Sequence, residues 1–88
     1  MTAANPPPTI VLLCLRVSTD GDPSVLTRLL GHFNNMNVTP RRVVAEFDSN
    51  AFLHVQVDVS GLSEQRLSLI TAKVGQNPSV LNAYWHHL

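Results

Sequence analysis

The segment Asp20–Phe33 holds the residues best placed to bind a ligand. Gly21 permits the positive φ angle of a tight turn, and Asp22 followed by Pro23 is typical of a capped helix start. The first N–H groups of such a helix point back into the turn and suit a small carboxylate or phosphate. The alternative is a strand-to-helix connection without a ligand, because helix starts are far commoner than ligand sites.

The sequence offers no catalytic or metal-binding constellation, so we expect neither an enzyme nor a cofactor. Cys14 lies in an apolar run, where burial makes a thiol a poor nucleophile. Ser24 has no histidine in its sequence context and is interpreted as a first-turn helix residue. The histidines are scattered along the chain, which favours surface or structural roles for His32, His54, His86 and His87.

The spacing of apolar residues predicts two helices and four strands. One nearly continuous apolar run predicts a central strand buried on both faces, and three further segments predict the other strands. Apolar residues at helical spacing, with Asp22 and Ser63 as caps, predict two amphipathic helices. The expected ranges are 9–18, 38–48, 51–60 and 79–87 for the strands, and 23–35 and 64–74 for the helices.

Further residues define the expected ends and faces of these elements. Asn35, Met36 and Asn37 are expected to end the first helix, because asparagine suits a left-handed C-terminal cap, and Gly75 is expected just past the second helix. Leu69 is expected to widen the buried side of the second helix. Leu81 is expected to share a face of the last strand with Trp85.

The element order β-α-β-β-α-β predicts an α+β, ferredoxin-like fold. Both helices would pack on one face of a four-stranded antiparallel sheet. The other face would be partly apolar, and its simplest cover is a second copy of the chain. The residues expected there are Leu12, Cys14, Phe52, His54 and Tyr84.

We also expect a homodimer that pairs the second strands of two copies. Its interface would include or adjoin Gly31, Arg41, Arg42 and Val44. A glycine inside a helix costs roughly 0.8–1.0 kcal/mol relative to alanine, which a close approach by a chain, strand or ligand would explain. Charge on an edge strand also blocks unwanted strand pairing, so the arginines either do that or meet an acidic partner or ligand carboxylate.

Length and charge limit the classes of partner. The 88 residues predict one domain at 9–88 after a flexible proline-rich leader at 1–8. Six basic residues balance six acidic ones, so we expect neither a nucleic-acid nor a membrane partner. The leader has no Lys or Arg and no apolar core, and the run 10–15 is too short to span a bilayer. We therefore expect a cytoplasmic protein.

The segment Leu26–Phe33 resembles the Leu-Ser-Arg-Val-x-Gly-Leu-Phe helix of ACT domains. It is most similar to the small regulatory subunit of acetohydroxyacid synthase, also called acetolactate synthase. The likeness covers roughly residues 10–85 and makes 9–88 an ACT-like domain. It implies a regulatory protein that activates the thiamine-diphosphate-dependent large subunit in branched-chain amino-acid synthesis. With one ACT domain, the chain looks like the short, feedback-insensitive type.

The resemblance also implies a small-amino-acid site between two ACT domains. The family's contacts come from the turn after the first strand and from the start of the second strand. The corresponding residues here are Gly21, Asp22, Ser24, Val25, Asn37, Val38 and Thr39. The family usually has Asn, Gly and Asn where this chain has Gly21, Ser24 and Thr39, and these differences argue against feedback by valine.

Other functions remain as alternatives. A stand-alone amino-acid sensor acting on another partner protein would use the same turn and helix start. An RNA-recognition motif shares the topology but needs aromatic and basic residues on the open sheet face, where the third strand offers only Phe52 and His54. A metal chaperone of this fold would need a Cys-x-x-Cys loop, whereas Cys14 is the single cysteine.

Overall fold

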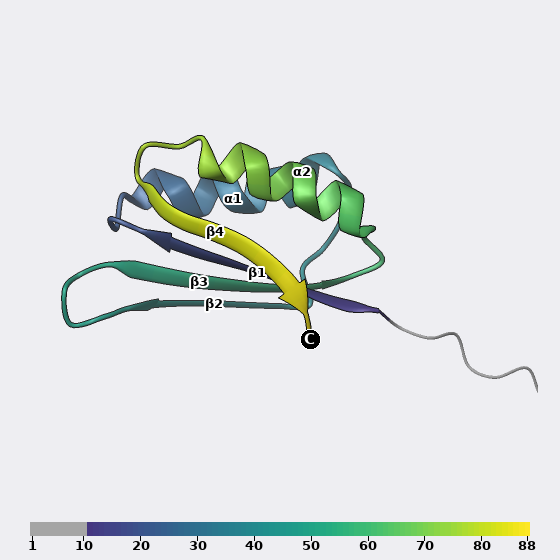
Figure 1. The fold of residues 1–88 in the computed structure, drawn as a ribbon, viewed down its shortest axis with the longest axis horizontal. Coiled ribbons are helices and arrows are strands. Elements are labelled where there is room, and N and C mark those ends of the chain that lie inside the picture. Colours follow the sequence, from purple (N-terminus) through teal and green to yellow (C-terminus); the bar gives the residue numbers. More distant parts are fainter. Residues whose placement is uncertain (1–10) are drawn as a thin grey trace, which may run out of the picture.

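Four antiparallel strands form one sheet, and two helices cover one of its faces (Figure 1). The computed structural model describes residues 11–88, so the predicted leader at 1–8 lies outside the described residues. The elements follow the predicted β-α-β-β-α-β order, and the strands lie side by side as β2-β3-β1-β4. Their bounds are β1 Leu12–Thr19, α1 Pro23–Asn35, β2 Arg42–Phe47, β3 Leu53–Ser60, α2 Glu64–Gly75 and β4 Val80–His87.

Strand β1 lies in the middle of the sheet and is buried on the helix face, whereas the prediction of burial on both faces holds only at Cys14, because Leu12, Arg16 and Ser18 on the other face are half-exposed. Leu13, Leu15 and Val17 face the helices and are at most 2% exposed. Cys14 faces the opposite side and is fully buried. The strand pairs with β3 on one side and with β4 on the other, so its backbone groups are hydrogen-bonded in both directions.

The core lies between this sheet face and the apolar stripes of the two helices. Each helix buries three residues one turn apart, and every second residue of β3 points at them. These positions match the predicted periodicity. The buried core residues of the helices and β3 are Val25, Leu29, Phe33, Leu53, Val55, Val57, Val59, Leu67, Ile70 and Val74.

The capping residues determine where the helices begin and where α1 ends. Asp22 caps α1 and accepts a hydrogen bond from the N–H of Ser24, and Ser63 caps α2. Asn37 has a φ of 56°, so the chain leaves α1 through the predicted left-handed residue. The prediction for Gly75 is wrong by one position, because Gly75 is the last residue of α2 and the right-handed Gln76 follows it.

The hairpin strands are shorter than predicted. Strand β2 begins at Arg42 rather than at Val38, because the N–H of Val38 bonds to the carbonyl of Phe33 and Pro40 has no N–H to donate. Strand β3 begins at Leu53, because Ala51 has a φ of 64° inside the turn. This turn is tied together by Asp48, whose carboxylate accepts the N–H groups of Asn50 and Phe52.

Two leucines lie on different surfaces from those expected. Leu69 is 53% exposed, because the buried stripe of α2 is narrower than predicted. The register of β4 against β1 shifts between Ser18 and Thr19, so Leu81 has no partner on β1 and is 57% exposed. Val80 packs against the core beside this irregularity.

The face of the sheet away from the helices is more polar than predicted. Arg16 donates from Nε to Nε2 of His86 across 3.0 Å, and Gln56 donates to Asp58 at the same distance. Oγ of Ser18 lies 3.0 Å from Nδ1 of His54. These hydrogen bonds reduce the apolar surface that a second copy would have to cover. Within residues 11–88, no helix is long and apolar enough to cross a membrane.

Two leucines on the same helix provide a matched test of this packing. Leu67 is fully buried, so Leu67→Ala should lower the free energy of unfolding by about 2–5 kcal/mol. Leu69→Ala should change it by less than about 0.5 kcal/mol, because Leu69 is mostly exposed. Urea denaturation followed by circular dichroism measures both, and equal losses would contradict the observed orientation of α2.

Candidate functional site

The turn between β1 and α1 is held by short local hydrogen bonds. The hydroxyl of Thr19, which is fully buried, accepts the N–H of Gly21 at 2.9 Å. Gly21 has a φ of 91°, and a Cβ there would lie 3.2 Å from the carbonyl oxygen of Ala51 and 3.3 Å from the ring of Phe47. The turn therefore lies against the end of the β2–β3 hairpin, and a side chain at Gly21 would be both strained and crowded.

The N–H groups at the start of α1 already have acceptors. Oδ1 of Asp22 accepts both the N–H and the hydroxyl of Ser24, at 2.9 and 2.8 Å. The backbone carbonyl of Asp22 accepts the N–H of Val25. Oδ1 of Asp20 accepts the N–H of Asp22, and Pro23 has no N–H. A ligand carboxylate would have to displace Asp22 and approach two aspartates. Binding at this turn stays a prediction.

The cap shifts the titration of Asp22. The backbone N–H of Ser24 is the main cause that lowers the pKa of Asp22 below its ordinary value of 3.8, and the hydroxyl of Ser24 adds to it. Hydrogen bonds to the ionised form favour that form. The capping interaction is therefore strongest when Asp22 is charged.

The other predicted ligand residues lie at the opposite end of the sheet. Asn37, Val38 and Thr39 follow the end of α1, whereas Gly21–Val25 surround its start. The 13 residues of α1 span roughly 20 Å at about 1.5 Å per residue. One chain therefore does not bring the two groups together, and a site that uses both requires a second copy.

The predicted interface residues also fall into two groups. Arg41 directly precedes β2, Arg42 begins this strand and Val44 lies within it, and both arginines are exposed. Arg41 donates its N–H to the carbonyl of Asp58, and its guanidinium lies 3.4 Å from the hydroxyl of Ser60. Gly31 lies instead beside a groove between the helices, and a Cβ there would meet nothing within 4 Å. Contacts within residues 11–88 therefore do not explain this glycine.

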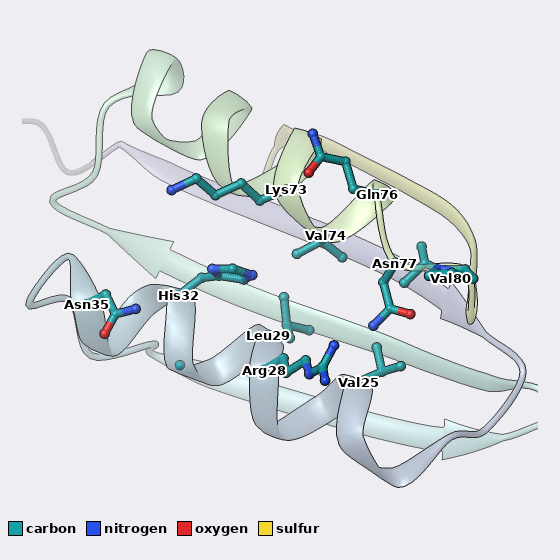
Figure 2. Close-up of a pocket in the computed structure, with 12 residues that line it drawn as sticks. Val25, Arg28, Leu29, His32, Asn35, Lys73, Val74, Gln76, Asn77 and Val80 are labelled. Carbon is teal, nitrogen blue, oxygen red and sulfur yellow. The ribbon is translucent and has the colours of Figure 1, made fainter.

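The groove between α1 and α2 has a volume of about 720 Å³ and was not predicted from the sequence (Figure 2). Its lining combines buried apolar residues with cationic and amide side chains. Arg28 and His32, one helical turn apart, were the available signal, but the partner helix that completes the groove begins only at Glu64. The lining residues are Val25, Arg28, Leu29, Gly31, His32, Asn35, Lys73, Val74, Gln76, Asn77, Pro78 and Val80.

Burial accounts for Cys14, and pairing with a carboxylate accounts for His54. Burial, followed by the neighbouring Asp58, raises the pKa of the Cys14 thiol to about 11. His54 pairs with Asp48 across 2.8 Å near the hairpin turn, and both side chains are partly exposed. In the described range 11–88, no three His, Cys, Asp or Glu side chains lie close enough together to hold a metal ion.

Comparison with known families adds to this geometry. The family model of the ACT-like domain matches residues 9–88. This chain belongs to that family. No curated protein matches it at a significant level. The ACT-like assignment that the Leu26–Phe33 segment suggested is therefore confirmed at the level of the domain family.

Solved structures share the fold of this ACT-like domain at low sequence identity. The C-terminal domain of MgtC from Mycobacterium tuberculosis matches with a TM-score of 0.72 at 15% identity, over 90% of this chain and 88% of that one. The ACT domain of GTP pyrophosphokinase from Chlorobium tepidum matches with 0.71 at 12%, over 89% and 100%. Formyltetrahydrofolate deformylase from Burkholderia mallei matches with 0.60 at 10%, over 86% and 27%. None of these three is an acetohydroxyacid synthase subunit.

The protonation of Asp22 provides a test of the capping geometry. Because the pKa of Asp22 is lowered in the folded chain, its stabilisation is present above the unfolded pKa and lost as the pH falls through the folded pKa. Asp22→Ala should therefore lower the urea midpoint more at pH 6 than at pH 3. Asp22→Asn retains a capping oxygen and should cost less than Asp22→Ala at pH 6. A penalty for Asp22→Ala that is the same at both pH values would contradict a charged cap.

Proposed function

We propose that this ACT-like domain is a non-catalytic regulatory protein that acts as a homodimer on a partner enzyme. The observation that carries the proposal is the free edge of β2. Among residues 11–88 this strand pairs only with β3, so within that range its other edge is available to a second strand. Val43 and Phe47, on the helix side of β2, are 41% and 65% exposed, which leaves apolar surface for a partner.

The residues on the other face of β2 are complementary in charge to the same residues of a second, antiparallel copy. Arg42, Val44 and Glu46 occupy every second position of the strand and so lie on that face. In an antiparallel pair centred on Val44, Arg42 of each copy would lie opposite Glu46 of the other. Opposite charges across a strand pair contribute roughly 0.2–1 kcal/mol, and two such pairs would form. This register supports a two-fold dimer with one continuous sheet.

The same symmetry would join the two groups of predicted ligand residues. Antiparallel pairing at β2 aligns the Phe47 end of one copy with the Arg42 end of the other. Gly21 lies against Phe47, and Thr39 precedes the start of β2. The turn of one copy would therefore lie beside the β2 start of the other. A small amino acid at that seam would have Arg41 of the second copy as a possible partner for its carboxylate.

We propose the large subunit of acetohydroxyacid synthase as the partner enzyme, on the basis of the Leu26–Phe33 segment. Leu29 and Phe33 of this segment are buried, so core packing accounts for them. Arg28, Gly31 and His32 of this segment line the groove between the helices, so the choice of partner rests on the resemblance of the segment and not on a contact of these residues. Similar folds in GTP pyrophosphokinase and formyltetrahydrofolate deformylase support an association of this fold with enzymes.

A charge exchange tests the dimer register. Arg42→Glu should weaken the dimer about five- to tenfold or more, because a glutamate would then lie opposite Glu46 of the other copy. The double variant Arg42→Glu with Glu46→Arg should restore it. Sedimentation equilibrium measures the dissociation constant. A wild-type chain that remains monomeric, or a double variant no better than the single one, would count against this pairing.

An activity assay tests the choice of partner. Adding the chain to the thiamine-diphosphate-dependent large subunit should raise the rate of acetolactate formation several-fold. Arg42→Glu should lose this effect, the charge-exchanged double variant should keep it, and valine should not reverse it. An unchanged rate would exclude this partner. Stabilisation by one amino acid in a thermal-shift screen would then favour the stand-alone sensor.

A further inference from the structure

The groove between α1 and α2 has an apolar floor and a cationic rim. Val25, Leu29 and Val74 lie at its base and are at most 4% exposed, so the accessible apolar surface comes mainly from other lining residues such as Pro78 and Val80. Arg28 and Lys73 extend along the groove from the two helices (Figure 2). The groove lies within the 300–1,000 Å³ range of small-molecule sites.

The cations of the rim have no acidic partner in the groove. Among the described residues, Arg28, His32 and Lys73 take part in no side-chain hydrogen bond and no salt bridge, and no Asp or Glu lines the groove. A cation is favoured in the last turn of a helix, which accounts for His32 and Lys73. It does not account for Arg28, which lies in the middle of α1.

Charge and space together identify the kind of occupant. A second copy packed through this face would bring like charges together, which disfavours self-association here. Arg28 and Lys73 are the two charged side chains in the groove lining, and the formal net charge is zero with histidine neutral, so the positive charge is too small for a nucleic-acid footprint. Amide side chains of Asn35, Gln76 and Asn77 add hydrogen-bonding groups. Gly31 has no side chain that could narrow the groove.

We propose that this groove binds a small organic anion, whose body lies along the groove and whose carboxylate or phosphate is attracted to a rim to which Arg28 and Lys73 contribute positive charge. The site is separate from the β1–α1 turn and from the β2 edge. It therefore does not rest on the proposed dimer or on the identity of the partner enzyme. It also gives Gly31 a function within one chain, because a larger side chain would narrow the groove.

Matched probes test the proposal on the whole chain. Hexanoate and hexyl phosphate carry an apolar body and an anion, hexanamide has a similar body without charge, and acetate has the charge without the body. Amide chemical shifts of the ¹⁵N-labelled chain measure where and how tightly each binds. We expect hexanoate or hexyl phosphate to shift the amides of Gly31, His32 and Val74, with affinity about tenfold above that of hexanamide or acetate.

Variants separate the groove from nonspecific attraction. Arg28→Gln and Lys73→Gln should each weaken anion binding about five- to tenfold, and Gly31→Leu should block it by filling the groove. Arg66→Gln is the matched control, because Arg66 lies on α2 outside the groove lining. It removes the same charge as Arg28→Gln and should leave binding unchanged. Unfolding midpoints measured in parallel show whether each variant is folded.

Three results would overturn the proposal. Equal binding of hexanoate and hexanamide would exclude the role of the cations. Shifts at the β1–α1 turn, or an equal loss with Arg66→Gln, would exclude the groove as the site. Binding of an acidic polypeptide such as polyglutamate, without binding of any small probe, would instead make this face a surface for a partner protein.

Discussion

Strand β1 is the element on which the rest of the structure depends. It is hydrogen-bonded to β3 on one side and to β4 on the other, and the two helices cover one of its faces. Leu13, Leu15 and Val17 provide the surface on which both helices pack, and burying such a side chain contributes about 1.5–3 kcal/mol. Thr19 then connects this buried strand to the turn before α1 through one hydrogen bond. The geometry of the turn is thus tied to the core.

The strands of this sheet differ in how much of their bonding capacity is satisfied within one chain. Within residues 11–88, both sides of β1 are hydrogen-bonded to neighbouring strands, whereas β2 has a free edge and exposed apolar residues on the helix side. Association through β2 would therefore leave the core unchanged. The groove between the helices lies on another part of the molecule. Effects of a ligand, a second copy and a partner enzyme can consequently be measured one at a time.

Local chemistry made much of the fold predictable. Asp22–Pro23, Asn37 and the alternation along β3 each specify a conformation through their own backbone or side chain. The errors arose where backbone pairing with another part of the chain determines the conformation or the exposure of a residue. Leu81 fits a strand pattern, but the register shift against β1 exposes it. Val38 suits a strand, but its N–H bonds back to Phe33.

The candidate sites were less predictable than the fold. The β1–α1 turn could be located because its residues are contiguous, but the sequence did not reveal that Asp22 occupies the donors of α1. The groove joins Arg28 to Lys73, which are far apart in the sequence and meet only because α1 and α2 pack side by side. Neither helix alone indicates that an apolar floor would lie between them.

Burial of Cys14 has a practical consequence for following the motions of the sheet. It is the single cysteine of the chain, it is fully enclosed in β1, and its thiol pKa of about 11 keeps it protonated near neutral pH. An alkylating reagent can therefore modify the folded chain only when β1 becomes accessible. The rate at which Cys14 is labelled would therefore measure how often β1 opens, without an added fluorophore or an engineered residue.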